Sequence, residues 1–221
     1  MTTLHRMLIL AALATLSGGP TAALAQPAPP APRPPAPAPA PAPEAPSDGL
    51  SQQDHDVLAV AQQLASGASQ VLEQWIITQA TTEERLFSRL YFPIPKTDPQ
   101  KYSTPYDTLA DRDLVGPEDK ALARATGLQY AIVTDINGYV PTHNTRFSQT
   151  LTGVPAQDYV NNRTKRIFGD LASVSAARSE AKYLIQRVKL ETGDIIYDLS
   201  VPVMVKGKHW GCVRIGYRRA E

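Results

Sequence analysis

The sequence predicts an α+β domain in which one long N-terminal helix packs on an antiparallel sheet of roughly five strands. Apolar residues recur in steps of four and three between about residues 50 and 90, which is the spacing of one helical face. From residue 128 to 218 the pattern changes to short runs rich in Val, Ile and Tyr. Turn-forming residues separate these runs, and Asn137-Gly138 is the clearest such pair.

The first 46 residues predict export followed by a spacer. Residues 1–25 combine Arg6, a short apolar run and the small residues Ala23-Leu24-Ala25, as in a signal peptide cleaved after Ala25. The alternative is an uncleaved membrane anchor, although the run is shorter than the ~20 residues that a membrane-spanning helix needs. Residues 26–46 alternate Pro and Ala, which predicts an extended, disordered linker. We therefore expect an exported, periplasmic protein with one folded domain over residues 47–221.

The long helix is predicted over residues 50–90 from its apolar stripe and from the prolines that end it. One face carries Val57, Ala61, Leu64, Ala68, Val71 and Trp75. Pro93 and Pro95 follow, and a residue before proline is pushed out of the helical region. A helix of about 35 residues spans about 50 Å, longer than a domain of this size. Either part of it projects, or its glutamine-rich N-terminal half joins a second copy in a homodimer.

Residues 96–127 mix turn formers with apolar residues, and the sequence assigns them no role. Pro117 is suited to the first turn of a short helix from Pro117 to Ala125, because its missing N–H is not needed there. A long ordered segment within a compact domain is often functional.

Strand patterns fill the rest of the chain. "LQYAIVTD" and "GYVPTHN", joined by the Asn-Gly turn, predict a first hairpin whose second strand delivers His143. "AKYLIQRVKLE" and "DIIYDLSVPVMV" predict a second hairpin around Thr192-Gly193, and Lys206-Gly207-Lys208 turns into a last strand. In the long strand Tyr197, Leu199 and Val201 share one face, and Asp198 lies on the other.

Composition and motifs exclude several classes of function. Basic and acidic residues nearly balance at a net charge of +1, which argues against nucleic acid as a partner. The single cysteine, Cys212, excludes an internal disulfide. The sequence contains no HxxxH or CxxC spacing and no GxSxG, phosphate-loop or GxGxxG motif. We therefore expect no metal site, no cofactor and no enzymatic activity.

Three segments carry a resemblance to a known family: "TDINGYVPTHN", "NNRTKRIFGD" and "YDLSVPVMVKGKHWGCVRIGY". Together they resemble the sensory region of bacterial methyl-accepting chemotaxis proteins, an extracytoplasmic domain of the single Cache type, which is PAS-like. The resemblance covers roughly the last ninety residues. It implies a small-molecule sensor in which the ligand lies between the sheet and the loops over its free face. The long helix would pack behind the sheet and contribute to a dimer.

The sequence also departs from such receptors. A chemotaxis receptor has a second membrane span and a cytoplasmic signalling region, whereas this sequence ends at Glu221 without them. We therefore expect a module without a transmembrane or signalling domain of its own, which binds a ligand and passes the result to a membrane receptor partner. The alternative function is a structural or protein-interaction module that keeps the fold but has lost the ligand.

The candidate ligand-binding residues are polar or aromatic positions in the resembling segments and the strands next to them: Tyr139, His143, Arg163, Lys165, Tyr183, Arg187, Tyr197, Asp198 and Arg214. Arginine can hold a carboxylate through two parallel hydrogen bonds, so a carboxylate is the expected ligand class. Three alternatives stay open. In the first, His143 would only be a polar residue at the sheet edge. In the second, Tyr197 would belong to the core, and in the third, Arg214 would form a structural ion pair with Asp198.

Overall fold

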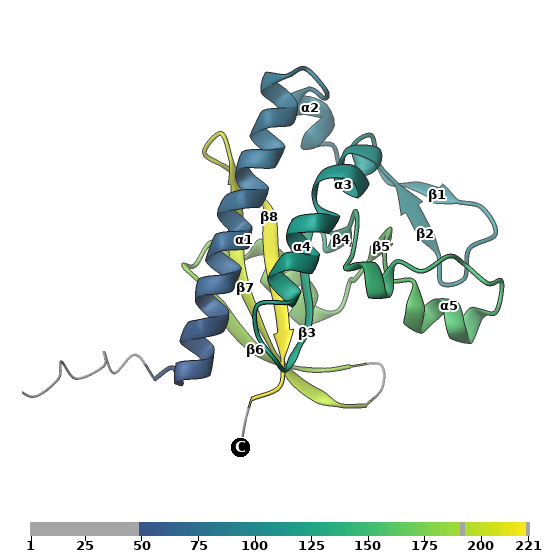
Figure 1. Cartoon of the computed structure of the whole chain (residues 1–221). Helices are drawn as coiled ribbons and strands as arrows, with labels where there is room; N and C mark the ends of the chain where they lie inside the picture. Colours follow the sequence, from purple (N-terminus) through teal and green to yellow (C-terminus); the bar gives the residue numbers. More distant parts are fainter. Residues whose placement is uncertain (1–48, 191–192, 220–221) are drawn as a thin grey trace, which may run out of the picture. The chain divides into compact units, whose positions relative to one another are not determined.

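The computed structural model describes residues 49–190 and 193–219 of the 221-residue chain (Figure 1). The chain divides into two units, Met1–Pro46 and Ser47–Glu221. The predicted signal peptide and proline-rich linker lie outside the described residues, as does Thr192 of the second predicted turn. Across the described ranges, no helix has both the length and the apolar character that crossing a bilayer requires.

Helix α1 spans Gln52–Ile77 and is shorter than the sequence predicts. Ser51 caps its start, and its side chain and that of Asp54 exchange hydrogen bonds with each other's backbone N–H. The prediction of a helix to residue 90 is wrong, because the chain turns at Thr78 and Gln79 has a left-handed φ of 59°. Thr82 then caps the separate short helix α2, Glu83–Leu86. At 26 residues α1 is about 39 Å long.

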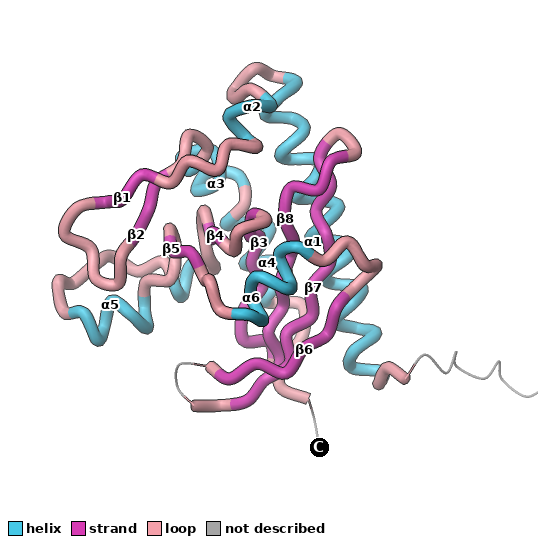
Figure 2. The backbone as a smooth tube through the Cα atoms, turned by 180° about the vertical axis from the view of Figure 1, so that it is seen from behind, coloured by secondary structure: helices cyan, strands magenta, loops and turns pink. Residues whose placement is uncertain are grey.

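The main sheet has four antiparallel strands rather than five, in the order β3-β8-β7-β6 (Figure 2). Its strands are β3 (Leu128–Asp135), β6 (Leu184–Lys189), β7 (Ile195–Val205) and β8 (Lys208–Tyr217). The β6–β7 and β7–β8 pairings follow the second predicted hairpin and the last predicted turn. The α+β class with a long helix and antiparallel sheets is thus confirmed, whereas the strand count is wrong.

The predicted fifth strand leaves the sheet at the Asn-Gly turn. Strand β4, Tyr139–Val140, pairs with β5, Arg166–Ile167, instead of with β3. A turn does form, since Gly138 has a left-handed φ of 75° and its N–H donates to the carbonyl oxygen of Asp135 at 2.9 Å, but the strands on either side of it do not pair as a hairpin. A Cβ on Gly138 would lie 2.4 Å from the carbonyl oxygen of Phe168, so glycine permits the approach of the β5 segment.

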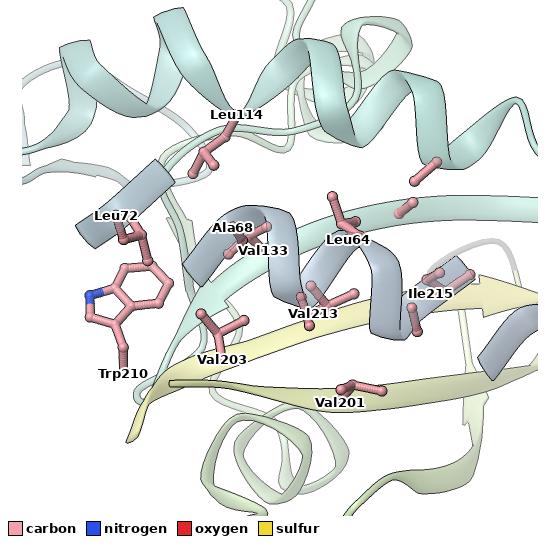
Figure 3. Packing of buried hydrophobic residues seen from close by; sticks show 14 of the residues in the cluster. Leu64, Ala68, Leu72, Leu114, Val133, Val201, Val203, Trp210, Val213 and Ile215 are labelled. Atoms are coloured by element: carbon pink, nitrogen blue, oxygen red, sulfur yellow. The ribbon is translucent and has the colours of Figure 1, made fainter. Parts of the chain in front are cut away.

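The two faces of the sheet pack against different elements. Helix α1 covers the face formed by alternate residues such as Val201, Val213 and Ile215 (Figure 3). Helix α6, Leu171–Arg178, lies on the opposite face, where Ala176 and Ala177 pack on Cys212. The core of the α1 face includes Leu64, Ala68, Leu72, Val133, Leu199, Val203 and Trp210. The sheet therefore has a closely packed apolar side and a second side on which polar residues occur.

The segment before β3 packs its last helix against that strand's free edge. It contains β1 (Phe92–Ile94), β2 (Lys101–Ser103), α3 (Asp107–Asp113) and α4 (Val115–Leu122), where α4 corresponds to the predicted Pro117–Ala125 helix. The N–H of Val133 donates to Glu118 Oε1 of α4 at 2.9 Å, and the N–H of Ala131 donates to Asn144 Oδ1 at 2.9 Å. Side chains thus accept hydrogen bonds from backbone N–H groups of the edge strand β3 that could otherwise pair with another strand.

Beyond β4 the chain forms the short helices η1, Thr145–Phe147, and α5, Pro155–Asn161. They precede β5, and together with the β4–β5 ladder they form a layer beside β3, away from α1 (Figures 1 and 2). The N–H of Tyr102 donates to the carbonyl oxygen of Lys165 at 2.8 Å, which joins β2 to this layer.

Replacing Glu118 with glutamine tests the role of its buried carboxyl group. Burial raises the pKa of Glu118 well above 4.5. The stability that the protonated group contributes is complete below pH 4.5 and is lost as the pH rises through the folded-state pKa. Relative to wild type, Glu118→Gln should therefore gain up to about 1.4 kcal/mol in unfolding free energy per pH unit above pH 4.5. Urea unfolding from pH 4 to 8 measures this gain.

The matched control is Glu84→Gln, which changes an exposed glutamate on α2. Its unfolding free energy should follow wild type at every pH within about 0.5 kcal/mol. A constant difference between Glu118→Gln and wild type over this range would contradict a protonated Glu118.

Candidate functional site

A cavity of about 140 Å³ lies on the sheet face opposite α1. Strands β3, β6 and β8 form one wall, and the residues around β4, β5 and the start of α6 form the other. Its lining residues are Tyr130, Ile132, His143, Arg163, Phe168, Asp170, Ser173, Val188, Lys189, Leu190 and Arg214. A cavity of about 150 Å³ holds a benzene-sized molecule, so this one suits a ligand of about six non-hydrogen atoms.

The apolar part of the wall depends on a close approach between β3 and β8. Tyr130 and Ile132 of β3 form a small cluster with Val140 and Ile196, and Phe168 and Val188 pack against it. A Cβ on Gly216 would lie 2.4 Å from the ring of Tyr130, so only glycine leaves room for that ring. The ring then places its hydroxyl 2.9 Å from Asp198 Oδ2, to which it donates.

A buried ion pair forms the polar part of the wall. Arg214 donates from Nε to Asp198 Oδ2 at 2.8 Å and also contacts this oxygen through Nη2. Its Nη1 donates to Ser173 Oγ at 2.8 Å. Burial by itself lowers the pKa of Arg214, but the negative charge of Asp198 outweighs it and raises that pKa, so the guanidinium stays charged.

His143 follows β4 in a loop and is 2% exposed. Its ring lies edge-on to Phe147 at 5.0 Å and to Tyr130 at 6.5 Å between ring centroids. Within the described part of the chain, Nδ1 has no hydrogen-bond partner. Burial lowers the pKa of His143 well below 6.5, and the positive charges of Arg163 and other arginines add to this effect. The imidazole is therefore neutral, in surroundings of positive potential.

Arg163 reaches the cavity from the segment between α5 and β5. Its guanidinium stacks on the ring of Phe147 at 4.5 Å, and Arg146 stacks on the same ring at 4.7 Å. The Nε of Arg163 donates to the carbonyl oxygen of Val160 at 3.2 Å. These contacts orient the guanidinium group of Arg163 at the cavity wall.

Asp170 is the acidic lining residue, and it also caps α6. Its carboxylate accepts from the N–H of Ser173 at 3.0 Å and from Ser173 Oγ at 2.6 Å. Burial raises the pKa of Asp170, but these hydrogen bonds outweigh it and hold the pKa below 3.8. Since Arg163, Lys189 and Arg214 also line the cavity, positive groups outnumber negative ones there.

The structure brings four of the nine sequence-predicted residues together. His143, Arg163 and Arg214 line the cavity, and Asp198 lies beneath it as the partner of Arg214. The ion pair between Arg214 and Asp198, which the sequence left as an alternative, is therefore present. Arg214 still lines the cavity, because its guanidinium pairs with Asp198 and faces the cavity at the same time.

Three predicted residues lie on the other face of the sheet. Tyr183 and Tyr197 pack against the core beneath α1, and Arg187 pairs in register with Tyr197, so its side chain points to the same side. The alternative that Tyr197 belongs to the core corresponds to its observed position. Arg187 is exposed, away from the cavity.

The two remaining predicted residues belong to the layer around β4 and β5. Tyr139 is fully buried, and its hydroxyl donates to Asp107 Oδ1 at 2.8 Å. Lys165 donates from Nζ to both carboxylate oxygens of Asp111 at 2.8 Å. Neither lines the cavity, because the predicted first hairpin does not form and β4 turns towards α3.

The sequence-based list of candidates left out eight lining residues: Tyr130, Ile132, Phe168, Asp170, Ser173, Val188, Lys189 and Leu190. Two signals could have found some of them. Strict alternation along β3 separates Tyr130 and Ile132 from the α1-facing Ala131 and Val133. The spacing of Asp170 and Ser173 is that of a helix cap.

No family model matches the sequence, and no curated protein matches it either. One solved structure that the chain resembles is the extracellular ligand binding receptor from Desulfohalobium retbaense DSM5692, at 13% sequence identity and a TM-score of 0.36. The similarity covers 76% of this chain but 26% of that chain, so this chain spans about a quarter of the receptor's length. Similarity of this degree establishes neither a shared fold nor a shared ligand.

Gly216→Ala should lower the free energy of unfolding by about 1–3 kcal/mol, because the new Cβ displaces the Tyr130 ring and weakens its bond to Asp198. Chemical denaturation measures the change. The control is Gly169→Ala, where a Cβ has no atom within 4 Å and should change stability by less than about 0.5 kcal/mol. Equal effects of the two substitutions would contradict the close packing of Tyr130.

His143 should remain neutral when the pH falls below 6.5. Because its folded-state pKa lies below 6.5, its contribution to stability is present above pH 6.5 and is lost as the pH falls through the folded pKa. Long-range ¹⁵N NMR of the imidazole from pH 7.5 to 5 should show the neutral ring throughout the upper part of this range. A ring that is mostly charged at pH 6 would contradict its burial.

Proposed function

We propose that the domain binds a small carboxylate in the cavity, as an exported sensor module of the Cache type. The observation that carries the proposal is a cavity of about 140 Å³ on whose wall Arg163, Arg214 and a buried His143 with an unpartnered Nδ1 come together. A buried polar atom without a partner is costly, and a ligand oxygen or N–H that meets it removes the cost. We further propose that the protein binds this molecule without transforming it.

The charge and the size of the cavity support a short carboxylate. Arg163, Arg146, Arg166 and Arg214 all lower the pKa of His143, so each adds positive potential at that ring. A planar guanidinium can hold both oxygens of a carboxylate. About six non-hydrogen atoms fit, which suits acetate, propionate, lactate or pyruvate.

The position of β8 supports a sensing role. Arg214 faces the cavity, whereas its neighbours Val213 and Ile215 pack in the core beneath α1. A ligand that shifts Arg214 therefore acts on the strand that touches the helix. Export, dimerisation through α1 and a membrane receptor partner belong to the same proposal and rest on the sequence patterns.

A second candidate is a protein-interaction module on the same fold. One observation favours it: four large apolar side chains in and next to α5 are between 38% and 47% exposed, namely Leu151, Val154, Tyr159 and Val160. In that case the cavity would hold no ligand.

A thermal-shift screen of the full chain against acetate, propionate, lactate and pyruvate tests the proposal, and calorimetry then measures affinity. A ligand at 100 times its Kd stabilises the folded state by about 2.7 kcal/mol, so the melting temperature should rise. Arg163→Gln should weaken binding about 10- to 100-fold, because it removes a charged hydrogen-bond donor.

The matched control is Arg187→Gln, an exposed arginine on the other face of the sheet. Its affinity should equal that of wild type. A screen in which no carboxylate raises the melting temperature would favour the interaction module, and equal losses in both variants would place the ligand elsewhere.

A further inference from the structure

A buried lysine lies directly beside the segment that carries Arg163. Lys101 of β2 is 3% exposed. Its Nζ donates to the carbonyl oxygen of Asn162 at 3.1 Å, to Asn162 Oδ1 at 2.7 Å and to the carbonyl oxygen of Thr164 at 2.6 Å. The two carbonyl groups belong to the residues immediately before and after Arg163. An ammonium group has three N–H donors, and each has an acceptor here.

The same segment is bonded to the loop that carries His143. The N–H of Lys165 donates to the carbonyl oxygen of Val140 at 2.7 Å, and Thr164 Oγ1 donates to that of Pro141 at 3.4 Å. The N–H of Arg163 donates to the carbonyl oxygen of Phe147 at 2.7 Å. The cavity-facing residues of both segments thus belong to one hydrogen-bonded unit, with Lys101 at its outer side.

We propose that Lys101 is a positioning residue for the cavity, whose buried ammonium fixes the Asn162–Thr164 segment and so holds Arg163 against the cavity. This role deepens the proposed function and rests on it for its effect on a ligand. Lys101 itself does not line the cavity, so it acts through Arg163.

The pKa of the Lys101 ammonium group lies close to neutral pH. Burial, helped by the positive charges of Arg166 and Lys165, lowers the pKa of Lys101 to about 8, and the charge of Asp158 of α5 opposes this shift. A neutral amine has two N–H donors, so one of the three acceptors loses its bond on deprotonation. The unfolded chain binds this proton more tightly than the folded chain does, so this titration alone does not unfold the protein as the pH rises. Its effect is on the geometry around Arg163.

Binding and titration are then linked in both directions. If the charged form of Lys101 positions Arg163 for a carboxylate, affinity should fall as the pH rises above about 8. By the same linkage, a bound carboxylate should raise the pKa of Lys101.

NMR of the full chain tests the positioning without any ligand. The Lys101 Cε signal should titrate near pH 8, and the Arg163 Nε–Hε signal should shift with the same midpoint. In Lys101→Met the Arg163 signal should lose this titration, and hydrogen-exchange protection of residues 162–165 should fall about tenfold, the effect of about one charged hydrogen bond. Protection of β8 should stay unchanged.

The control is Lys182→Met, an exposed lysine before β6 that should match wild type in every measurement. The proposal is overturned if the Arg163 signal does not follow Lys101, or if Lys101→Met keeps the protection of wild type. Should that variant fail to fold, the titration of the wild-type signals decides alone.

Calorimetry with pyruvate at pH 7 and pH 9 separates this inference from the proposed function. The expected results are weaker binding by wild type at pH 9 and about tenfold weaker binding by Lys101→Met at pH 7. Pyruvate that binds equally well at both pH values overturns the role of Lys101 in binding. If none of the four carboxylates binds, the proposed function fails, and the Arg163 signal still decides whether Lys101 positions that residue.

Discussion

The buried pair of Arg214 and Asp198 is the interaction on which the cavity side of the sheet depends. Removing a guanidinium and a carboxylate from water costs several kcal/mol per ion, and only well-placed hydrogen bonds offset that cost. Tyr130 supplies one bond from β3, and Ser173 supplies another from α6. The pair therefore joins a neighbouring strand and a covering helix to the sheet. The cavity is the space that this arrangement leaves open next to the pair.

The opposite face of the sheet is apolar and packs against α1. Alternate residues of β7 and β8 are aliphatic there and pack closely against α1. Strand β8 takes part in both faces, because Val213 and Ile215 flank Arg214. Its glycines make the contrast possible: Gly216 admits the Tyr130 ring, and a Cβ on Gly211 would lie 2.0 Å from the carbonyl oxygen of Thr134. A single strand thus combines tight packing on one side with a charged group at a cavity on the other.

Local patterns account for the part of the structure that the sequence could predict. The stripe of α1 and the β6–β7 and β7–β8 pairings follow from periodicity and from turns within a few residues. The end of α1 at Ile77 carries no proline or glycine signal, and it follows from capping by Thr78 and the restart at Thr82. The β4–β5 pairing joins segments separated by the helices η1 and α5, so no local pattern specifies it. Of the site, His143, Arg163 and Arg214 could be predicted by residue type. Tyr183, Arg187 and Tyr197 were predicted to line the cavity, but they lie on the α1 side of the sheet. The position of a residue along its strand, not its type, decides which face of the sheet its side chain occupies.

The two walls of the cavity are stabilised by different interactions, and this difference decides which wall a ligand can move. The sheet wall is built from long strands with continuous pairing and a packed helix behind them. The other wall depends on the two-residue strands β4 and β5, on stacked arginine and aromatic side chains, and on side-chain bonds to carbonyl groups. Segments with few ladder bonds and few buried apolar contacts open at a lower free-energy cost than a sheet does. The layer that carries His143 and Arg163 is therefore the wall that a bound ligand can move most easily.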